Sequence, residues 1–208
     1  MTGKHPIRIV LPDAGPLISL ACGDALDLLL CFHAEVRIVL TDVVEFEVTH
    51  RSSDLSDARA IIEFLDRNKA RIEVMPTTVG SLALADLRLK QQSGRPATLG
   101  TDIGELSITS FVISLRTVNP GAPTLVIVED DWFESNTYAM PGNVHLVSTS
   151  AWLDGLESLK VIESAAEVRT RIQAARPHFR AGLQLDKEAE KIQGGTNWRA
   201  AVRPGSGG

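Results

Sequence analysis

Three short apolar runs rich in β-branched residues divide the chain, and acidic residues follow each of them closely. The runs are residues 7–12, 36–40 and 124–128. Runs of this length and composition are typical of buried strands, and segments with helical apolar spacing separate them. The pattern predicts an α/β fold, a three-layer α/β/α domain with a mainly parallel sheet.

Weaker patterns complete the scaffold. Helical apolar spacing recurs at residues 58–65 and 82–89, and residues 71–75 have the composition of a short strand. Gly94 and Pro96 mark the connection at residues 93–100, which ends before the next helix. These segments predict supporting elements and carry no candidate site.

Acidic residues stand directly after two of the apolar runs. Asp13 follows the first run, and the pair Asp130 and Asp131 follows the third after one further acid. In an open α/β sheet, ligands bind outside the carboxyl ends of the strands, so these positions favour a functional role. Helix capping is the alternative, for Asp13 before a helix near Gly15 and for Asp131 before a helix containing Trp132.

The segment after the second run predicts a helix with Thr41 or Asp42 as its N-cap. Helical spacing places Glu47 beside the apolar stripe, whereas Glu45 projects further round the helix. A carboxylate beside an apolar stripe is more often a boundary residue than a catalytic one. Spacing alone therefore does not decide whether Glu47 is a boundary residue of the helix or a catalytic carboxylate.

Residues 101–115 predict a mostly buried helix that begins with the sequence Asp-x-x-Glu. Asp102 and Glu105 are suited to a capping box, in which each side chain accepts a hydrogen bond from a backbone N–H. Glu105 is the better candidate for a functional carboxylate, because it lies further inside the helix and next to Gly104, whose missing side chain allows a close approach.

In order and spacing, these segments resemble a PIN-domain nuclease over about residues 7–160. The matching motifs are DAGPLI at 13–18, TDVVEFEV at 41–48, DIGEL at 102–106 and VEDDW at 128–132. Residues 145–168 look like the last strand and following helices of that family. Gly15 stands where the family often has a small hydroxyl residue, and Thr41 stands where it often has proline.

The resemblance implies a metal-dependent endoribonuclease that hydrolyses RNA phosphodiester bonds, often the toxin of a toxin–antitoxin pair of the VapBC type. It implies an RNA substrate, a cognate antitoxin partner and a homodimer. It also selects Glu47 over Glu45, and retains Asp102 as a secondary candidate. The catalytic candidates are Asp13, Glu47, Glu105, Asp130 and Asp131, and the metal ligands among them are Asp13, Glu105, Asp130 and Asp131.

The residue types fix the expected metal. A site built of carboxylates, without His or Cys, favours Mg²⁺ or Mn²⁺ over Zn²⁺. Two other functions use similar residues. One is a catalytically inactive PIN-like module that binds RNA or protein. The other is a receiver-like phosphoacceptor, which is less favoured because no lysine stands at the end of the last predicted strand.

Charge is distributed unevenly along the 208 residues. Residues 1–159 hold 12 Lys and Arg against 21 Asp and Glu, whereas residues 160–208 hold 9 against 5. We therefore expect a PIN-like nuclease domain at 1–160 and a helical basic extension at 161–208, ending in a disordered tail. Within the extension Arg169, Arg171 and Arg176 are candidates for RNA contact, with a solvated helix face as the alternative.

Cysteine usage and hydropathy bear on the compartment. Cys22 and Cys31 have no metal-ligand spacing and are expected to be reduced core residues. No apolar run reaches the length of a membrane span, and the start of the sequence lacks a signal-peptide pattern. The expectation is a cytoplasmic protein without membrane contact.

Overall fold

A five-stranded sheet forms the centre of the molecule. The computed structural model describes residues 7–50, 54–119, 121–130, 132–136, 140–177 and 198–203. Within them the strand order is β3-β2-β1-β4-β5, and every pair of neighbouring strands is parallel. The strands are β1 (Ile9–Pro12), β2 (Arg37–Thr41), β3 (Ile72–Met75), β4 (Thr124–Val128) and β5 (Val144–Ser148). The predicted α/β class is confirmed.

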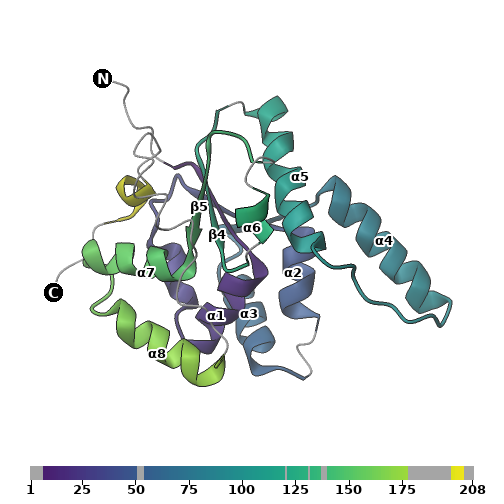
Figure 1. Ribbon diagram of the computed structural model, residues 1–208, viewed down its shortest axis with the longest axis horizontal. Coiled ribbons are helices and arrows are strands. Elements are labelled where there is room, and N and C mark those ends of the chain that lie inside the picture. The colour runs from purple at the N-terminus through teal and green to yellow at the C-terminus, as the bar shows by residue number, and fades with distance from the viewer. Residues whose placement is uncertain are drawn as a thin grey trace.

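Helices flank the sheet (Figure 1). α1 contacts α3 and α8, and α8 contacts α7, while α5 packs against β2 and carries α4 beside it. In Figure 1, α4 projects from the body next to α5. The helices are α1 (Ala14–Cys22), α2 (Asp42–Thr49), α3 (Ser56–Arg67), α4 (Thr78–Gln92), α5 (Ile103–Val118), α6 (Trp132–Ser135), α7 (Thr149–Ser158) and α8 (Ala165–Ala175), with 3-10 turns η1 (Leu26–Cys31) and η3 (Trp198–Ala201).

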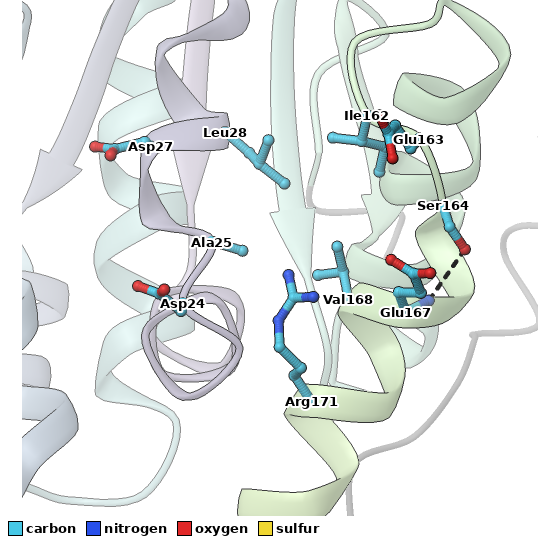
Figure 2. Close-up of a pocket in the computed structure, with 10 residues that line it drawn as sticks. All are labelled: Asp24, Ala25, Asp27, Leu28, Ile162, Glu163, Ser164, Glu167, Val168 and Arg171. Carbon is cyan, nitrogen blue, oxygen red and sulfur yellow. Dashed lines mark hydrogen bonds between the residues drawn. The ribbon is translucent and has the colours of Figure 1, made fainter.

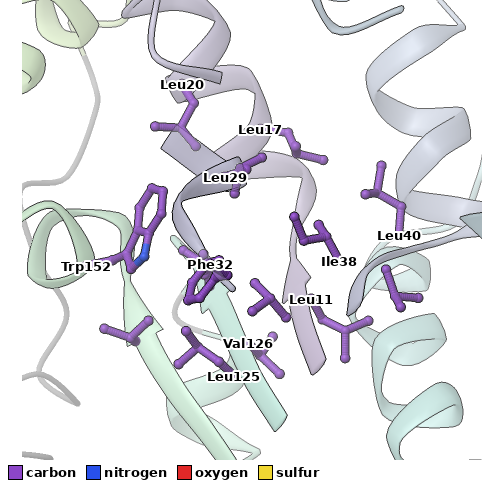
Figure 3. Packing of buried hydrophobic residues seen from close by; sticks show 14 of the residues in the cluster. Leu11, Leu17, Leu20, Leu29, Phe32, Ile38, Leu40, Leu125, Val126 and Trp152 are labelled. Atoms are coloured by element: carbon purple, nitrogen blue, oxygen red, sulfur yellow. The ribbon is translucent and has the colours of Figure 1, made fainter. Parts of the chain in front are cut away.

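The hydrophobic core explains why these segments are strands. All four residues of β1 and all five of β4 are buried, as expected for central strands covered on both faces. Figure 3 shows Leu11, Val126 and Ile38 of the sheet packed with Phe32 and with Trp152 of α7. Trp152 and Phe32 are fully buried. The core therefore holds the central strands, and with them their carboxyl ends, in fixed positions.

The part of the predicted extension that the structure describes packs into this same core. Val168 and Ile172 of α8 are buried, and Val202 forms an antiparallel bridge with Phe32. Trp198 lies against α7, where a Cβ added to Gly155 would come within 2.5 Å of its ring. The boundary at residue 160 stays a prediction, and the predicted disordered tail at 204–208 lies outside the described residues.

Two further expectations concern cysteines and membranes. Cys22 and Cys31 are free thiols, and Cys31 is buried. Burial raises the pKa of Cys31 to about 12, so its thiol stays protonated at neutral pH. In the described ranges, no helix combines the length and the apolar character that crossing a bilayer would require.

Candidate active site

The strand order creates a topological switch point between β1 and β4. The chain leaves β1 towards β2 on one side and leaves β4 towards β5 on the other, so the order of strands reverses between these two central strands. Pro12 pairs with Ile127, and the Asp13 N–H donates to the Ile127 carbonyl oxygen at 2.9 Å. The residues that follow both strands therefore meet at the place where α/β sheets usually bind ligands.

Asp13 is the most deeply buried of the candidate carboxylates, at 5% exposure. It occupies the N-cap position of α1, but its side chain makes no capping hydrogen bond, so capping does not explain its burial. Burial, together with the negative charges of Glu105, Glu47 and Asp130, raises the pKa of Asp13 from 3.8 to about 8. A hydrogen bond from the Ala14 N–H acts in the opposite direction. Asp13 is thus a buried carboxyl group whose ionisation three other carboxylates oppose.

Glu47 approaches the same group from α2. Burial, with a smaller contribution from the negative charge of Glu105, raises the pKa of its side chain to about 7. A Cβ added to Gly104 would lie 2.7 Å from Glu47 Oε2, so the missing side chain makes room for this carboxylate. Glu45 is half-buried on the same helix, and only burial raises its pKa. The predicted distinction between Glu47 and Glu45 agrees with this geometry.

Glu105 lies on the first turn of α5, facing the other acids. Burial raises the pKa of Glu105, and the charges of Asp130 and Asp102 raise it as well. A hydrogen bond from its own backbone N–H lowers the pKa and offsets part of this rise. Asp102 was predicted to form a capping box with Glu105, and that prediction is wrong. Asp102 has a left-handed backbone, with φ of 60°, and makes no side-chain cap hydrogen bond. Its carboxylate instead contributes negative potential at Glu105.

Asp130 is the exposed member of the group. Its Oδ1 accepts a hydrogen bond of 2.6 Å from the Trp132 N–H at the start of α6. Asp130 therefore caps the first residue of this helix, whereas the capping alternative for Asp131 falls outside the described residues. One oxygen of Asp130 is occupied in this way, while its charge still raises the pKa of Asp13 and Glu105. Asp131 lies outside the described residues.

A chain of buried hydroxyls fixes α2 relative to α5. The Val44 N–H donates to Thr41 Oγ1, which lies 2.6 Å from Ser107 Oγ, and Ser107 donates to the Gly104 carbonyl oxygen. Because Ser107 uses its proton on Gly104, Thr41 is the donor of the pair. Of the two predicted N-caps, Thr41 or Asp42, Thr41 is the one that caps α2, and it also sets the distance between the helices that carry Glu47 and Glu105.

The carboxylates fit a hard divalent cation in chemistry but do not form a ready-made cage. The groups that shift the pKa values of Asp13, Glu47 and Glu105 include no lysine or arginine within the described part of the chain. Three or more acidic, His or Cys side chains close enough together to hold a metal ion are nonetheless not found among the described residues. The arrangement suits a cation that keeps several of its waters, as Mg²⁺ does.

Sequence reasoning missed the role of Glu129. Its Oε2 accepts from Ser19 Oγ at 2.9 Å and from Arg176 Nη1 at 3.1 Å, and its Oε1 accepts from Thr149 Oγ1 at 2.7 Å. It is absent from the groups that shift the pKa of Asp13. Strand alternation is the signal that could have separated it from Asp130, because successive side chains point to opposite faces.

The structure explains why a glycine stands at position 15, where the family often has a small hydroxyl residue. A Cβ at this position would lie 3.2 Å from both Cβ and Oε2 of Glu129. That spacing is tighter than ordinary van der Waals contact, so Glu129 takes up the space that a side chain would need. Gly15 therefore belongs to the Glu129 network, and its missing hydroxyl says nothing against Asp13 as a ligand.

The three candidate RNA-contact arginines all have partners within the chain. Arg169 pairs with Asp154 at 2.5 Å, and Arg171 Nε donates to the Gly23 carbonyl oxygen at 2.8 Å. Arg176 donates to Glu129, Ser19 and the Gly15 carbonyl oxygen. These contacts give each arginine a structural role, and contact with RNA stays a prediction.

A cavity of about 290 Å³ lies elsewhere, between η1 and α8 (Figure 2). Its walls combine apolar side chains with carboxylates and the Arg171 guanidinium. None of the predicted site acids lines it. Its lining residues are Asp24, Ala25, Asp27, Leu28, Ile162, Glu163, Ser164, Glu167, Val168 and Arg171.

Comparison with known proteins finds likeness among solved structures. No family model matches the chain, and no curated protein matches it. Among solved structures, the chain is similar to one described as VapBC2 from Rickettsia felis bound to a DNA fragment from their promoter. The TM-score is 0.40 at 14% sequence identity, and the match covers 67% of this chain and 98% of that one.

Proposed function

We propose that this chain is a metal-dependent endoribonuclease with a PIN-like fold, which hydrolyses RNA phosphodiester bonds at the switch point between β1 and β4. One observation carries the proposal: Asp13, Glu47, Glu105 and Asp130 lie near enough to one another there that their charges, in addition to burial, raise the pKa values of Asp13, Glu47 and Glu105. Carboxylates that oppose one another's ionisation become stable together when a divalent cation binds them.

The residues divide into two roles. Asp13 and Asp130 extend from adjacent strand ends and would hold a Mg²⁺ or Mn²⁺ ion, with Asp131 as an additional candidate. Glu47 and Glu105 would bind through water or hold a second ion. A bound divalent cation lowers the pKa of an attacking water and stabilises negative charge on the phosphate. The protein supplies the buried carboxylate of Asp13, and α2 and α5 hold Glu47 and Glu105 near it.

The metal also accounts for how an acidic surface accepts a polyanion. Phosphate groups are repelled by carboxylates unless cations neutralise them locally. A divalent ion held by Asp13 and Asp130 would offset that repulsion at the scissile phosphate. Basic side chains of residues 160–208 supply further positive charge for the rest of an RNA strand.

The test is Mn²⁺-supported cleavage of a single-stranded RNA by wild type, Asp13→Asn and Asp130→Asn. Each substitution keeps the shape of the side chain and removes its charge. We expect both variants to lose at least about a hundredfold in cleavage rate, because an isosteric change removes a metal ligand. Circular dichroism and a thermal melt should show folded protein in both cases.

Glu45 offers a matched control for Glu47, since both are half-buried glutamates of α2. Glu47→Gln should slow cleavage, whereas Glu45→Gln should leave the rate within about twofold of wild type. Full activity in both aspartate variants, or equal losses in both glutamine variants, would show that cleavage does not depend on this cluster.

The biological setting is proposed from the family resemblance. As a toxin, the protein should suppress growth when it is produced alone in the cytoplasm, and a small antitoxin encoded beside it should restore growth. Exposed apolar side chains support a protein partner or a homodimer, because such residues often mark contact surfaces. They lie on α4 and α5 and are Leu82, Leu89, Ile113 and Val118. Size-exclusion chromatography with light scattering would identify the oligomer.

A second candidate function is a PIN-like module that binds RNA or protein without cleaving. The contact between Asp130 Oδ1 and the Trp132 N–H favours it, because that bond occupies an oxygen otherwise available to a metal. Titration calorimetry separates the two functions. The nuclease should bind Mn²⁺ with saturation, whereas the inert module should bind RNA equally well with and without Mn²⁺.

A further inference from the structure

Arg176 links the two strand ends that carry the candidate metal ligands. It stands at the C-cap of α8, and its Nη1 donates to the Gly15 carbonyl oxygen at 3.0 Å and to Glu129 Oε2 at 3.1 Å. The same nitrogen contacts Ser19 Oγ. Gly15 lies two residues after Asp13. Glu129 directly precedes Asp130.

Glu129 is held on several sides at once. Its side chain is 12% exposed, and its two oxygens accept hydrogen bonds from Ser19 of α1, Thr149 of α7 and Arg176 of α8. Both carboxylate oxygens are therefore occupied, which leaves Glu129 unsuited to bind a cation or substrate directly. Its place in the fold is that of a junction between three helices and the end of β4.

We propose that Arg176 and Glu129 form a clasp that positions Asp13 and Asp130 for binding a divalent cation. The proposal rests on the proposed function, because the cation is that of the nuclease site. Both members of the clasp are positioning residues. Partners that orient metal ligands commonly change metal affinity or activity by about ten- to a hundredfold when they are removed.

The clasp has a clear alternative, which is that it only adds stability. An ion pair removed from water often contributes little net stability, because the desolvation cost offsets the attraction. Here Arg176 Nη1 bonds both the Gly15 carbonyl oxygen, near Asp13, and the Glu129 side chain, beside Asp130. That connection predicts an effect on metal affinity larger than on the melting temperature.

The experiment compares Mn²⁺ affinity by calorimetry, and RNA cleavage, in wild type and Arg176→Met. Arg71→Met is the matched control, since Arg71 Nη2 also donates to backbone carbonyls, those of Phe32 and His33. We expect Arg176→Met to weaken Mn²⁺ binding about tenfold or more and to lower kcat with KM for RNA unchanged. Arg71→Met should leave Mn²⁺ affinity within about twofold of wild type.

Two further variants keep the test decisive if Arg176→Met folds poorly. Arg176→Lys should restore most of the affinity, because all three contacts come from one nitrogen and an ammonium carries three protons. The double variant Arg176→Met with Glu129→Gln avoids an unpaired buried charge. It should fold well and still bind Mn²⁺ weakly. Wild-type affinity in a folded Arg176→Met protein or in the double variant would overturn the clasp.

Failure of the nuclease proposal would give a different result. If wild type neither binds Mn²⁺ nor cleaves RNA, hydrogen exchange of peptides covering residues 9–17 and 124–130 decides the positioning claim. Faster exchange at both strand ends in Arg176→Met, and not in Arg71→Met, would support the clasp without a nuclease. Unchanged exchange would overturn it.

Discussion

Replacing Asp13 with Asn should stabilise the metal-free protein at alkaline pH. Asp13 is 5% exposed and lies among other carboxyls, so its ionised form is unfavourable in the folded state. Asparagine keeps the size of the side chain and can still accept the hydrogen bond from the Ala14 N–H. Removing the charge therefore removes a cost that the folded protein carries without its cation.

The size of this cost follows from the pKa. The folded pKa of Asp13 is about 8 and its ordinary value is 3.8, a rise of about four units. At about 1.4 kcal/mol for each unit, ionising Asp13 costs the folded state at most about 6 kcal/mol. Relaxation and water entry reduce such costs, so we expect Asp13→Asn to gain about 2–4 kcal/mol at pH 8.5.

The pH window has a definite sign. Between pH 4 and pH 8 the folded state keeps a proton on Asp13 that the unfolded chain has lost. Stability from this group is fully present below pH 4 and is lost as pH rises through 8, with a limiting slope of about 1.4 kcal/mol per pH unit. Asp13→Asn should lack this component and show a flatter dependence.

Urea denaturation of metal-free protein from pH 5 to pH 8.5 measures both quantities. Asp66→Asn is the control, because Asp66 is an exposed aspartate of α3 and should change stability by less than about 0.5 kcal/mol. Adding Mn²⁺ should reverse the order at pH 8.5, stabilising wild type and leaving the variant unaffected. Equal stability and equal pH slopes in wild type and Asp13→Asn would refute the reasoning.

Two other predictions concern the same carboxylates. Gly104→Ala should displace the Glu47 carboxylate, because the new Cβ would lie 2.7 Å from Glu47 Oε2. The cleavage rate should fall about tenfold or more, while the free energy of unfolding should change by less than about 1 kcal/mol. Gly100→Ala meets only ordinary contacts and should leave the rate unchanged. Mn²⁺ affinity should rise from pH 6 to pH 8.5, because Asp13 and Glu47 must lose protons with pKa values of about 8 and about 7 on binding. Calorimetry in buffers of different ionisation enthalpy would detect the released protons, and pH-independent affinity without proton release would contradict this.

The strands could be predicted from the sequence because short apolar runs rich in β-branched residues favour buried strands over other structures. Residues 124–128 form β4 with the predicted bounds, and the second run forms β2 one residue later than predicted. The position of Asp13 after a buried strand then follows, because central strands of a parallel sheet end at a common edge. Helical phase placed Glu47 beside the apolar stripe and Glu45 further round, and the family resemblance then selected Glu47.

The remaining features depend on contacts between distant segments. Asp102 adopts a left-handed backbone that no spacing rule reveals, so its capping box was predicted wrongly. The capping role of Asp130 depends on how tightly the chain turns after β4. In the sequence Glu129 is one of three consecutive acids. Only the folded structure shows that Ser19, Thr149 and Arg176 donate hydrogen bonds to it. Sequence identifies which residues reach the edge of the sheet, whereas packing determines which of them face one another.

Anomalous diffraction from crystals grown with Mn²⁺ would test the central claim most directly, because it locates the cation without relying on activity. We expect a peak between the carboxylates of Asp13 and Asp130, with Glu47 and Glu105 within one water of it. The peak should disappear in Asp13→Asn crystals. Ordered carboxylates at the switch point with no peak between them, at Mn²⁺ concentrations that saturate calorimetry, would show that these residues do not form a metal site.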